Sequence, residues 1–460
     1  MKKYFFRLFL FILIIFNIII ISNYYKKIFS NDQIIIKSKS EEIINNELLS
    51  YLYETQIDSG IYQTVSDSNW DLTNYRFNSK LSKCQNGSKL SYNEITKQVT
   101  LQGNKADKCY LYFDQVSLIK FSDYIKSLYT SDGTNGMYLH DGVGTYTNAD
   151  LEAGDNSYRF SGTNPRNYVC FGSNEEVCAV ENLYRIIGVF NNDGEDQIKL
   201  IKYDYATENM LGTETYGTKS TKDDYFNTYR GFLLEIPRHS WSKRGTYSNN
   251  SWKDNLLYSE TLNYNFLNFF DKINTNWNKM IALHNWSIGG LDMNYATHSN
   301  AKKSYDYELG EYKTTGAYVS DCDGNGPGTE TCTYDSIVEA KIGLMYTSEY
   351  YYSSDPAYWS FPVFTYETNP DVNGNYGPQY DYRAATDSNW MYMGSVEWTM
   401  SKPNSPTTAT GAFFIFQTGY VNTFAGVTAY CAIRPTFYLD NSVVYISGNG
   451  TIIEPFRVSI

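Results

Sequence analysis

The sequence predicts an α+β protein with an N-terminal transmembrane helix, a stalk helix, a small disulfide-closed β module and a large mixed α+β C-terminal domain. Three observations carry this prediction: an apolar run over residues 4–22, cysteines that occur in local couples, and strand-like alternation with few helical stretches. The expected boundaries are 1–30 for the signal-anchor, 31–59 for the stalk, 60–117 for the β module and 118–460 for the ectodomain.

The apolar run YFFRLFLFILIIFNIIIIS (4–22) is interrupted only by Arg7 and Asn17. At a helical rise of about 1.5 Å per residue it spans roughly the 30 Å hydrocarbon core of a bilayer. A cleaved signal peptide is the competing interpretation, but it requires small residues before the cut, and Tyr and Lys follow here instead. The flanking Lys and Arg favour a cytoplasmic N-terminus. We therefore expect a single-pass cell-membrane protein that contacts the lipid bilayer through residues 4–22.

Six of the seven cysteines form local couples in loops rich in Gly, Asn and Ser. Paired cysteines of this kind indicate disulfides in an oxidising exterior, and the alternatives are free thiols or a zinc site. The zinc interpretation lacks nearby histidine ligands. The expected couples are Cys84 with Cys109, Cys170 with Cys178, and Cys322 with Cys332.

Charge supports an exterior location for the chain beyond the anchor. The formal net charge is −12, and the first 30 residues contain basic side chains but no acidic ones, so the remainder is more acidic still. An acidic exterior domain repels nucleic acid, which we exclude as a partner.

Residues 34–56 carry apolar side chains at helical spacing, among them Ile36, Ile43 and Leu52, without a Pro or Gly. This spacing predicts the stalk helix, which Gly60 ends.

Strand-like alternation follows the predicted stalk. Asn86-Gly87 and Gly103-Asn104 are turn signals between the expected strands. A β module of this size needs the Cys84–Cys109 bond to stabilise it.

The C-terminal domain alternates strand-like runs with polar loops. Helices are expected at 118–130 and 261–281, and long surface insertions around 205–260 and 285–335. The expected strands are LYRIIGVF (183–190), QIKLIKYD (197–204), KIGLMYTS (341–348), AFFIFQ (412–417), AYCAIRPTFYL (429–439) and SVVYIS (442–447).

Several strings of the exterior chain carry a family resemblance. They are KCQNGSKLSYNEITKQVTL to DKCYLYFD (83–114), NYVCFG (167–172), ENLYRIIGVF (181–190), IKLIKYDYATENMLGT (198–213), AKIGLMYTSEYYY (340–352), NWMYMGSVEWTMS (389–401) and CAIRPTFYLDNSVVYISGNGTIIEPFRV (431–458). Together they resemble an uncharacterised family of surface proteins from low-GC Gram-positive bacteria. The resemblance implies a membrane-tethered protein with a C-type-lectin-like or formylglycine-generating-enzyme-like core, and it implies no activity. Relatives often begin with a type IV prepilin leader, which this chain lacks, and this departure weighs against assembly into a pilus.

Catalytic motifs are not apparent, and no catalytic residue is assigned. The sequence has no GxSxG elbow, HExxH pair or Gly-rich phosphate loop. His284 lies in an apolar setting beside Trp286 and is interpreted as a packed core histidine rather than a general base. Cys431 lies in an apolar strand and is interpreted as a small buried hydrophobe. A pair of carboxylates of the glycosidase type stays open, because no local pattern selects one.

One acidic loop is a candidate calcium site. Oxygen ligands at alternate positions resemble the start of a calcium loop, but Cys322 and Cys332 already close this loop. A solvated acidic turn is the alternative, and no other cofactor is expected. The candidate ligands are Asp321, Asp323, Asn325 and Glu330.

A group of aromatic residues is the candidate ligand-binding face. Flat rings stack on the apolar faces of sugars, although core packing and codon bias also explain many of them. The candidates are Tyr350, Tyr352, Trp359, Trp390, Tyr392 and Trp398. Arg185 and Arg434 lie in apolar strands and need buried carboxylate partners, for which Glu397 is suggested.

These observations favour a surface protein that binds an extracellular glycan or protein, as a ligand-binding or adhesion module. An extracellular polysaccharide-active enzyme that uses a carboxylate pair is the first alternative, and a pilin-like structural subunit is the second.

Overall fold

The computed structural model divides the chain into two compact units. Unit 1 consists of residues 1–118 with 174–177, and unit 2 consists of residues 119–173 and 178–460. The structure describes residues 33–37, 49–65, 74–93, 98–103, 107–131, 133–144, 148–175, 177–213, 216–221, 235–241, 252, 255–273, 275–287, 290–291, 300–308, 337–361, 382–403, 411–422 and 426–460.

Unit 1 is built from two small sheets. One has the strand order β1-β7-β6, and the other has the order β3-β2-β8-β4 with β5 also paired to β8. The strands are β1 (Gln33–Lys37), β2 (Leu49–Glu54), β3 (Tyr62–Thr64), β4 (Tyr75–Phe77), β5 (Lys83–Cys84), β6 (Lys89–Asn93), β7 (Gln98–Gln102) and β8 (Cys109–Gln115).

The two sheets of unit 1 share one apolar cluster. Val99 and Leu101 of β7 pack in the same buried cluster as Tyr51 of β2 and Leu111 and Phe113 of β8. Alternate residues of each strand therefore face the neighbouring sheet, as in a sandwich.

The disulfide Cys84–Cys109 lies inside unit 1 and is confirmed. It joins β5 to β8 at directly opposed positions. The predicted turn at Asn86-Gly87 is held by Asp107, whose carboxylate accepts hydrogen bonds from the backbone N–H groups of Asn86 and Ser88. Although burial opposes ionisation, these hydrogen bonds lower the pKa of Asp107.

The predicted stalk helix is wrong for the residues that the structure describes. Residues 33–37 form β1, which pairs antiparallel with β7, and residues 49–54 form β2, which pairs parallel with β8. Isoleucine-rich and tyrosine-rich segments fit a pleated surface well, and strand partners about 60 to 70 residues away override the local helical spacing. In the described part of the chain no helix is long and apolar enough to cross a membrane, and the predicted anchor at 4–22 lies outside it.

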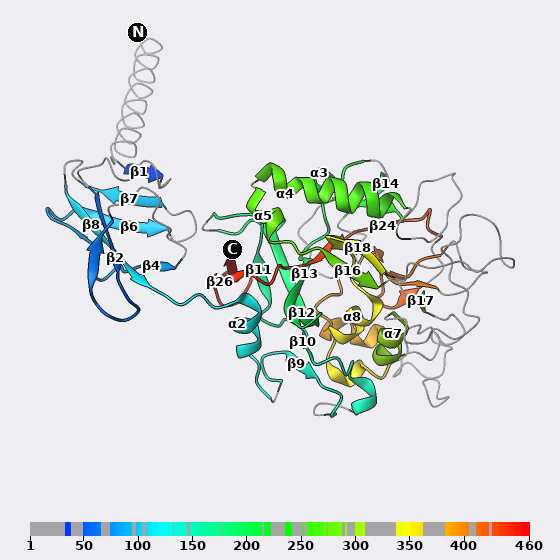
Figure 1. Ribbon diagram of the computed structural model, residues 1–460. Helices are drawn as coiled ribbons and strands as arrows, with labels where there is room; N and C mark the ends of the chain where they lie inside the picture. Colours follow the sequence, from blue (N-terminus) through cyan, green and yellow to red (C-terminus); the bar gives the residue numbers. More distant parts are fainter. Residues whose placement is uncertain are drawn as a thin grey trace, which may run out of the picture. The chain divides into compact units, whose positions relative to one another are not determined.

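Unit 2 is a mixed α+β structure around a seven-stranded sheet of order β19-β25-β13-β12-β10-β9, with β11 also paired to β12 (Figure 1). Its helical segments are α2 (Phe121–Ser127), η1 (Ala149–Leu151), η2 (Val180–Asn182), α3 (Glu208–Leu211), η4 (Leu257–Phe266), α4 (Leu267–Ile273), α5 (Thr275–Lys279), α7 (Ala301–Glu308), α8 (Thr347–Tyr352), η5 (Pro356–Tyr358) and η7 (Tyr382–Ser388). Its strands are β9 (Met137–His140), β10 (Ser157–Phe160), β11 (Tyr168–Cys170), β12 (Leu183–Asn192), β13 (Glu195–Lys202), β14 (Tyr216–Thr221), β15 (Glu235–Ser240), β16 (His284–Ser287), β17 (Gly290–Leu291), β18 (Ile337–Ala340), β19 (Ile342–Gly343), β20 (Glu397–Trp398), β21 (Lys402–Pro403), β22 (Phe414–Ile415), β23 (Val421–Asn422), β24 (Tyr430–Cys431), β25 (Thr436–Tyr438), β26 (Val444–Ser447) and β27 (Arg457–Ser459).

The two faces of the large sheet differ in chemistry. On one face Tyr184 and Phe437 contact the ring of Phe270 in α4. On the other face Lys199, which lies opposite Tyr438 in the register, reaches Glu349 of α8. Because successive side chains of a strand alternate between faces, β13 and β25 each contribute to both environments.

Most of the expected elements of the C-terminal domain are confirmed. The strands at 183–190 and 197–204 appear as β12 and β13, and the helix at 261–281 appears as η4, α4 and α5. The helix at 118–130 is the shorter α2. The strands at 412–417 and 442–447 shorten to β22 and β26, and 429–439 splits into β24 and β25.

One predicted strand is partly wrong. The run 341–348 contains only the two-residue strand β19, and helix α8 begins at Thr347. The cause is a capping box, in which the Glu349 carboxylate accepts a hydrogen bond from the backbone N–H of Tyr346. Much of the predicted insertions at 205–260 and 285–335 lies outside the described residues.

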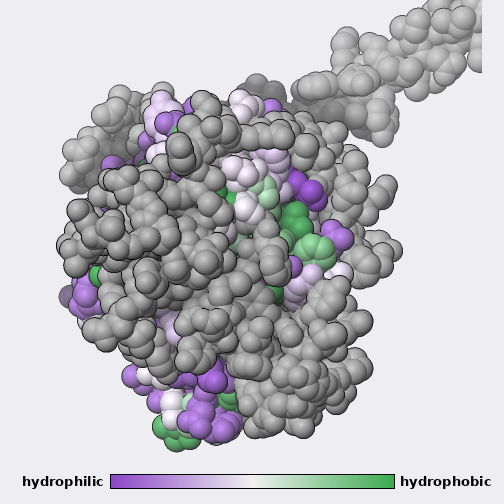
Figure 2. All heavy atoms as spheres, turned by 90° about the vertical axis from the view of Figure 1, so that its right-hand side faces the viewer, coloured by the Kyte–Doolittle hydropathy of each residue, from purple (hydrophilic) through white to green (hydrophobic). Residues whose placement is uncertain are grey.

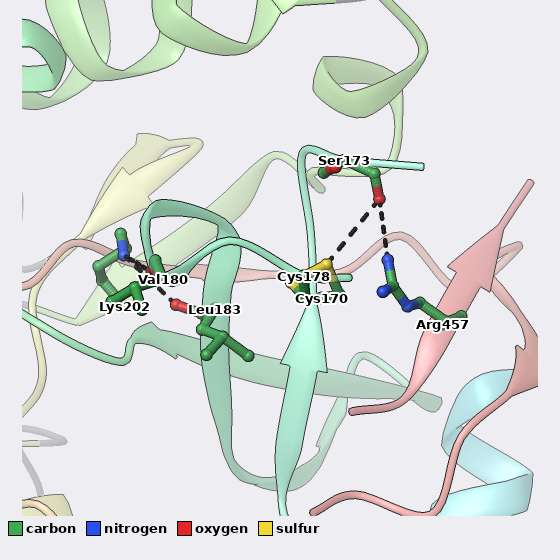
Figure 3. The surroundings of a disulfide bond; sticks show 7 residues. All are labelled: Cys170, Ser173, Cys178, Val180, Leu183, Lys202 and Arg457. Atoms are coloured by element: carbon green, nitrogen blue, oxygen red, sulfur yellow. Dashed lines mark hydrogen bonds between the residues drawn. A yellow bond between two sulfur atoms is a disulfide. The ribbon is translucent and has the colours of Figure 1, made fainter. Parts of the chain in front are cut away.

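The disulfide Cys170–Cys178 is also confirmed, and it closes a short loop after β11 (Figure 3). The carbonyl oxygen of Ser173 within this loop accepts a hydrogen bond from Arg457 of β27 at 3.3 Å. Beside it, Lys202 donates to the carbonyl oxygens of Val180 and Leu183 at 3.1 and 3.4 Å (Figure 3). The predicted bond Cys322–Cys332 lies outside the described residues.

Candidate functional site

A buried group of charged side chains lies in unit 2 between the large sheet and helices α7 and α8. Lys199 of β13 donates to Glu349 of α8 with 2.6 Å between Nζ and Oε1, and the two side chains are 0% and 3% exposed. Lys199 stands in an otherwise apolar run, IKLI, and reaches the charged face because its neighbours Ile198 and Leu200 occupy the other one. An ion pair sealed from solvent interacts far more strongly than a surface pair.

Aromatic rings surround this lysine. Its Nζ lies 4.8 Å from the ring centre of Trp286, 4.5 Å from that of Tyr346 and 5.3 Å from that of Tyr438. Tyr346 is itself held by a hydrogen bond from its hydroxyl to the carbonyl oxygen of Ser287. Burial lowers the pKa of Lys199, and the carboxylate of Glu349 opposes this shift.

A second carboxylate, Glu308, lies at the last position of α7. It accepts hydrogen bonds from the backbone N–H groups of Thr347 and Ser348 and from the Ser401 hydroxyl. Burial raises its pKa to about 7, against these hydrogen bonds, and the charge of Glu349 adds to the increase. Glu308 and Glu349 together therefore hold the first turn of α8.

A second ion pair, in which the side chains of Arg159 and Asp155 are 2% and 20% exposed, lies near enough to interact with Glu349. The guanidinium of Arg159 on β10 donates to Asp155 at 2.6 Å and to the Ser157 hydroxyl at 2.7 Å, and it lies over the rings of Tyr305 and Tyr352. Although burial opposes it, Arg159 lowers the pKa of Asp155 to about 2. Both groups are therefore charged throughout the physiological range.

The described histidines of this region are neutral at physiological pH. Burial lowers the pKa of His284 to about 3, and its ring packs against Tyr438 with 3.9 Å between ring centres. His140 is fully buried, its Nδ1 accepts from the backbone N–H of Ala153, and burial lowers its pKa well below the usual value. A base with so low a pKa is a poor proton acceptor near neutrality, which agrees with the packed-histidine interpretation of His284.

The structure corrects the predicted aromatic binding face, because all six side chains are at most 4% exposed. Each polar tip is satisfied by a backbone carbonyl oxygen. The hydrogen bonds run from Tyr350 to Gly419, Tyr352 to Leu151, Trp359 to Ser354, Trp390 to Phe160, Tyr392 to Gln417 and Trp398 to His239. These residues stabilise the core, since their large apolar rings gain most from burial.

The suggested partnership of Arg434 with Glu397 is confirmed. The two side chains are 1% and 2% exposed, and Nε of Arg434 lies 2.7 Å from Oε1 of Glu397. Arg434 also donates to the carbonyl oxygen of Met391. Arg185 finds amide and carbonyl oxygens, with Nε donating to Asn167 at 2.7 Å.

Cys431 is a buried free thiol, as expected. Burial raises its pKa far above the usual value, so the thiolate needed for metal binding or nucleophilic attack is suppressed.

The predicted calcium ligands Asp321, Asp323, Asn325 and Glu330 lie outside the described residues. Within the part of the chain that the structure describes, no three His, Cys, Asp or Glu side chains are grouped so that they could hold a metal ion.

The sequence reasoning missed the group formed by Lys199, Glu308 and Glu349. One signal was available, because a lysine between isoleucine and leucine in a strand is rarely buried without a carboxylate partner. The two glutamates gave no such signal, since 50 acidic residues offer many candidates.

No protein-family model, curated protein or solved structure matches this chain. The chemistry of the site is therefore argued from its geometry. Both carboxylates are buried and occupied by backbone N–H groups, a serine hydroxyl or a lysine, an arrangement that orders α8 against the sheet.

Proposed function

We propose that this chain is a membrane-anchored extracellular surface protein whose unit 2 binds a ligand outside the cell. The observation that carries the proposal is that both units contain a disulfide, Cys84–Cys109 in unit 1 and Cys170–Cys178 in unit 2. Such bonds persist in oxidising compartments, so they indicate an extracellular or otherwise oxidising location. The apolar run at 4–22 supplies the anchor in this proposal.

We favour binding over polysaccharide cleavage because the buried carboxylates Glu308 and Glu349 are closed to solvent and already hydrogen-bonded. Glu308 and Glu349 influence each other electrostatically, but a glycosidase pair has to face a sugar and a water molecule. Here both are 2–3% exposed and already accept hydrogen bonds from the protein. The acidic net charge of −12 argues against nucleic acid as the ligand.

A glycan is the first ligand class to test, because the resemblance noted in the sequence implies a lectin-like core. A protein ligand is the second. On the face of the molecule in Figure 2, both hydrophilic and hydrophobic residues are visible among those described.

Location is tested on intact cells that express the full chain. We expect an added protease to degrade both units, and alkylation without reductant to leave the Cys84–Cys109 and Cys170–Cys178 sulfurs unlabelled. Full protection from the protease, or alkylation of all four sulfurs, would contradict the proposal.

Ligand binding is tested with a glycan array probed by the oxidised exterior part, residues 31–460. The matched control is the same protein after reduction and alkylation, which loses both disulfides. Signals from the oxidised protein alone support a glycan ligand. If an oxidised, folded sample binds no glycan, the proposal of a carbohydrate ligand is wrong.

A further inference from the structure

Lys199 and Glu349 come from distant parts of the chain and meet in a single sealed contact. They are 150 positions apart in sequence, and their Nζ and Oε1 atoms lie 2.6 Å apart. Because the two side chains are 0% and 3% exposed, bulk water does not compete for either group. An amine and a carboxyl group held in this way have the proximity that favours an intramolecular reaction between them.

Burial favours the uncharged form of the lysine. The rings of Trp286, Tyr346 and Tyr438 lie within 5.3 Å of Nζ, and an apolar setting of this kind makes isolated charges costly. Burial correspondingly lowers the pKa of Lys199. Transfer of one proton from the ammonium to the carboxylate gives a neutral amine, which is a nucleophile, and a carboxylic acid, which is an electrophile.

A third buried group holds the electrophile in place. Glu308 accepts hydrogen bonds from the N–H groups of Thr347 and Ser348, so it fixes the turn of α8 that presents Glu349. Glu308 interacts electrostatically with both Lys199 and Glu349. We assign it a positioning role, because its hydrogen bonds go to the helix and to Ser401.

We propose that the folded protein joins Lys199 to Glu349 through an intramolecular amide bond. The lone pair of Nζ attacks Cδ of Glu349 and forms the C–N bond, and one C–O bond then breaks. The departing oxygen takes the two protons that the lysine ammonium loses, and it leaves as one water molecule. Charge and atoms balance without an oxidant, reductant or co-reactant. The product links β13 covalently to α8, and expulsion of the water from an apolar site opposes hydrolysis.

The test is the intact mass of the full chain, purified in folded form and measured after denaturation and reduction of the disulfides. We expect a mass lower than that of the reduced sequence by one water molecule. Proteolytic digestion should yield one branched peptide whose fragments place the junction at Lys199 and Glu349. A folded sample with the full sequence mass would overturn the proposal, as would a branched peptide joined at other residues.

Lys202 provides a matched control on the same strand. It is also buried, but its Nζ donates to the carbonyl oxygens of Val180 and Leu183 and lies over the ring of Tyr184. We expect Lys202→Met to retain the loss of water and Lys199→Met to have its full sequence mass. Loss of water in folded Lys199→Met would contradict the assignment. The wild-type measurement decides the proposal even where a variant fails to fold.

Discussion

The two units bury carboxylates in different ways. In unit 1, Glu54 accepts hydrogen bonds from the backbone N–H groups of Gly60 and Gln115, and Asp107 accepts two from the turn at Asn86-Gly87. Unit 2 also contains buried carboxylates that face buried cations, namely Glu349 beside Lys199 and Glu397 beside Arg434. Neutral backbone donors satisfy these carboxylates of unit 1, whereas the two ion pairs of unit 2 tie side chains that are 150 and 37 positions apart in the chain.

Core size explains why unit 2 accommodates such pairs. The core cluster of unit 1 is a short set of residues from β2, β7 and β8, with a disulfide at its edge. Unit 2 has an extended aromatic and aliphatic core that offsets the desolvation of several charges. The small unit is therefore expected to depend on its covalent bond, and the large unit on intact charge pairing.

The largest expected effect is the loss of one partner of a buried pair in unit 2. Arg434→Met leaves the Glu397 carboxylate buried and unpaired, so we expect the free energy of unfolding of unit 2 to fall by about 3–5 kcal/mol. Chemical denaturation followed by tryptophan fluorescence measures it. The double variant Arg434→Met/Glu397→Met should recover most of the loss, and a single variant as stable as the double would contradict this explanation.

Removal of the disulfide in unit 1 tests how far the stability of this unit depends on its covalent bond. Cys84→Ser/Cys109→Ser opens a loop with a sequence separation of 25, and loop entropy predicts a loss of about 3–4 kcal/mol for unit 1. Hydrogen exchange of the β8 amides should accelerate, while that of β12 in unit 2 stays unchanged. Equal acceleration in both strands would show that the units do not unfold separately.

The units should also differ in the sign of their pH dependence. The pKa of Glu308 is raised from 4.5 to about 7, so its stabilising contribution to unit 2 is complete below pH 4.5 and is lost as the pH rises through about 7, on the order of 3 kcal/mol in total. The pKa of Asp107 in unit 1 is lowered, so its contribution is present above its usual value of 3.8 and is lost as the pH falls.

Comparison of the wild type with Glu308→Gln isolates the contribution of Glu308 to the free energy of unfolding of unit 2. The lowered pKa values of His140 and His284 act in the opposite direction, because these histidines stabilise unit 2 as the pH rises toward 6.5. Their effect cancels in the difference between the two proteins. We expect the stability difference to shrink between about pH 4 and pH 8, and a difference independent of pH would rule out titration of Glu308.

The smallest effect is expected for a half-exposed ion pair of unit 2. Lys126 of α2 and Asp196 of β13 are 32% and 28% exposed, so solvent screens their attraction. Lys126→Met should cost about 0–1 kcal/mol in the same denaturation measurement that is used for Arg434→Met. A loss as large as that of Arg434→Met would mean that burial does not decide the strength of these pairs.

The sequence by itself determined the features that depend on local chemistry. The Cys84–Cys109 and Cys170–Cys178 couples, the burial of Cys431, the strands β12 and β13 and the helical stretch from η4 to α5 all follow from spacing within a short window. The pairing of Arg434 with a carboxylate could also be predicted, because a charge buried in an apolar strand needs a partner.

Tertiary structure decided what depends on distant partners. Residues 33–37 and 49–54 became strands through pairing with β7 and β8. Helix α8 begins at Thr347 through contacts of Glu308 and Glu349, and the six candidate aromatic residues lie in the core. Periodicity reports which residues are apolar over a few turns. It does not report which surface covers them, because burial and pairing are properties of chain segments brought together only by folding.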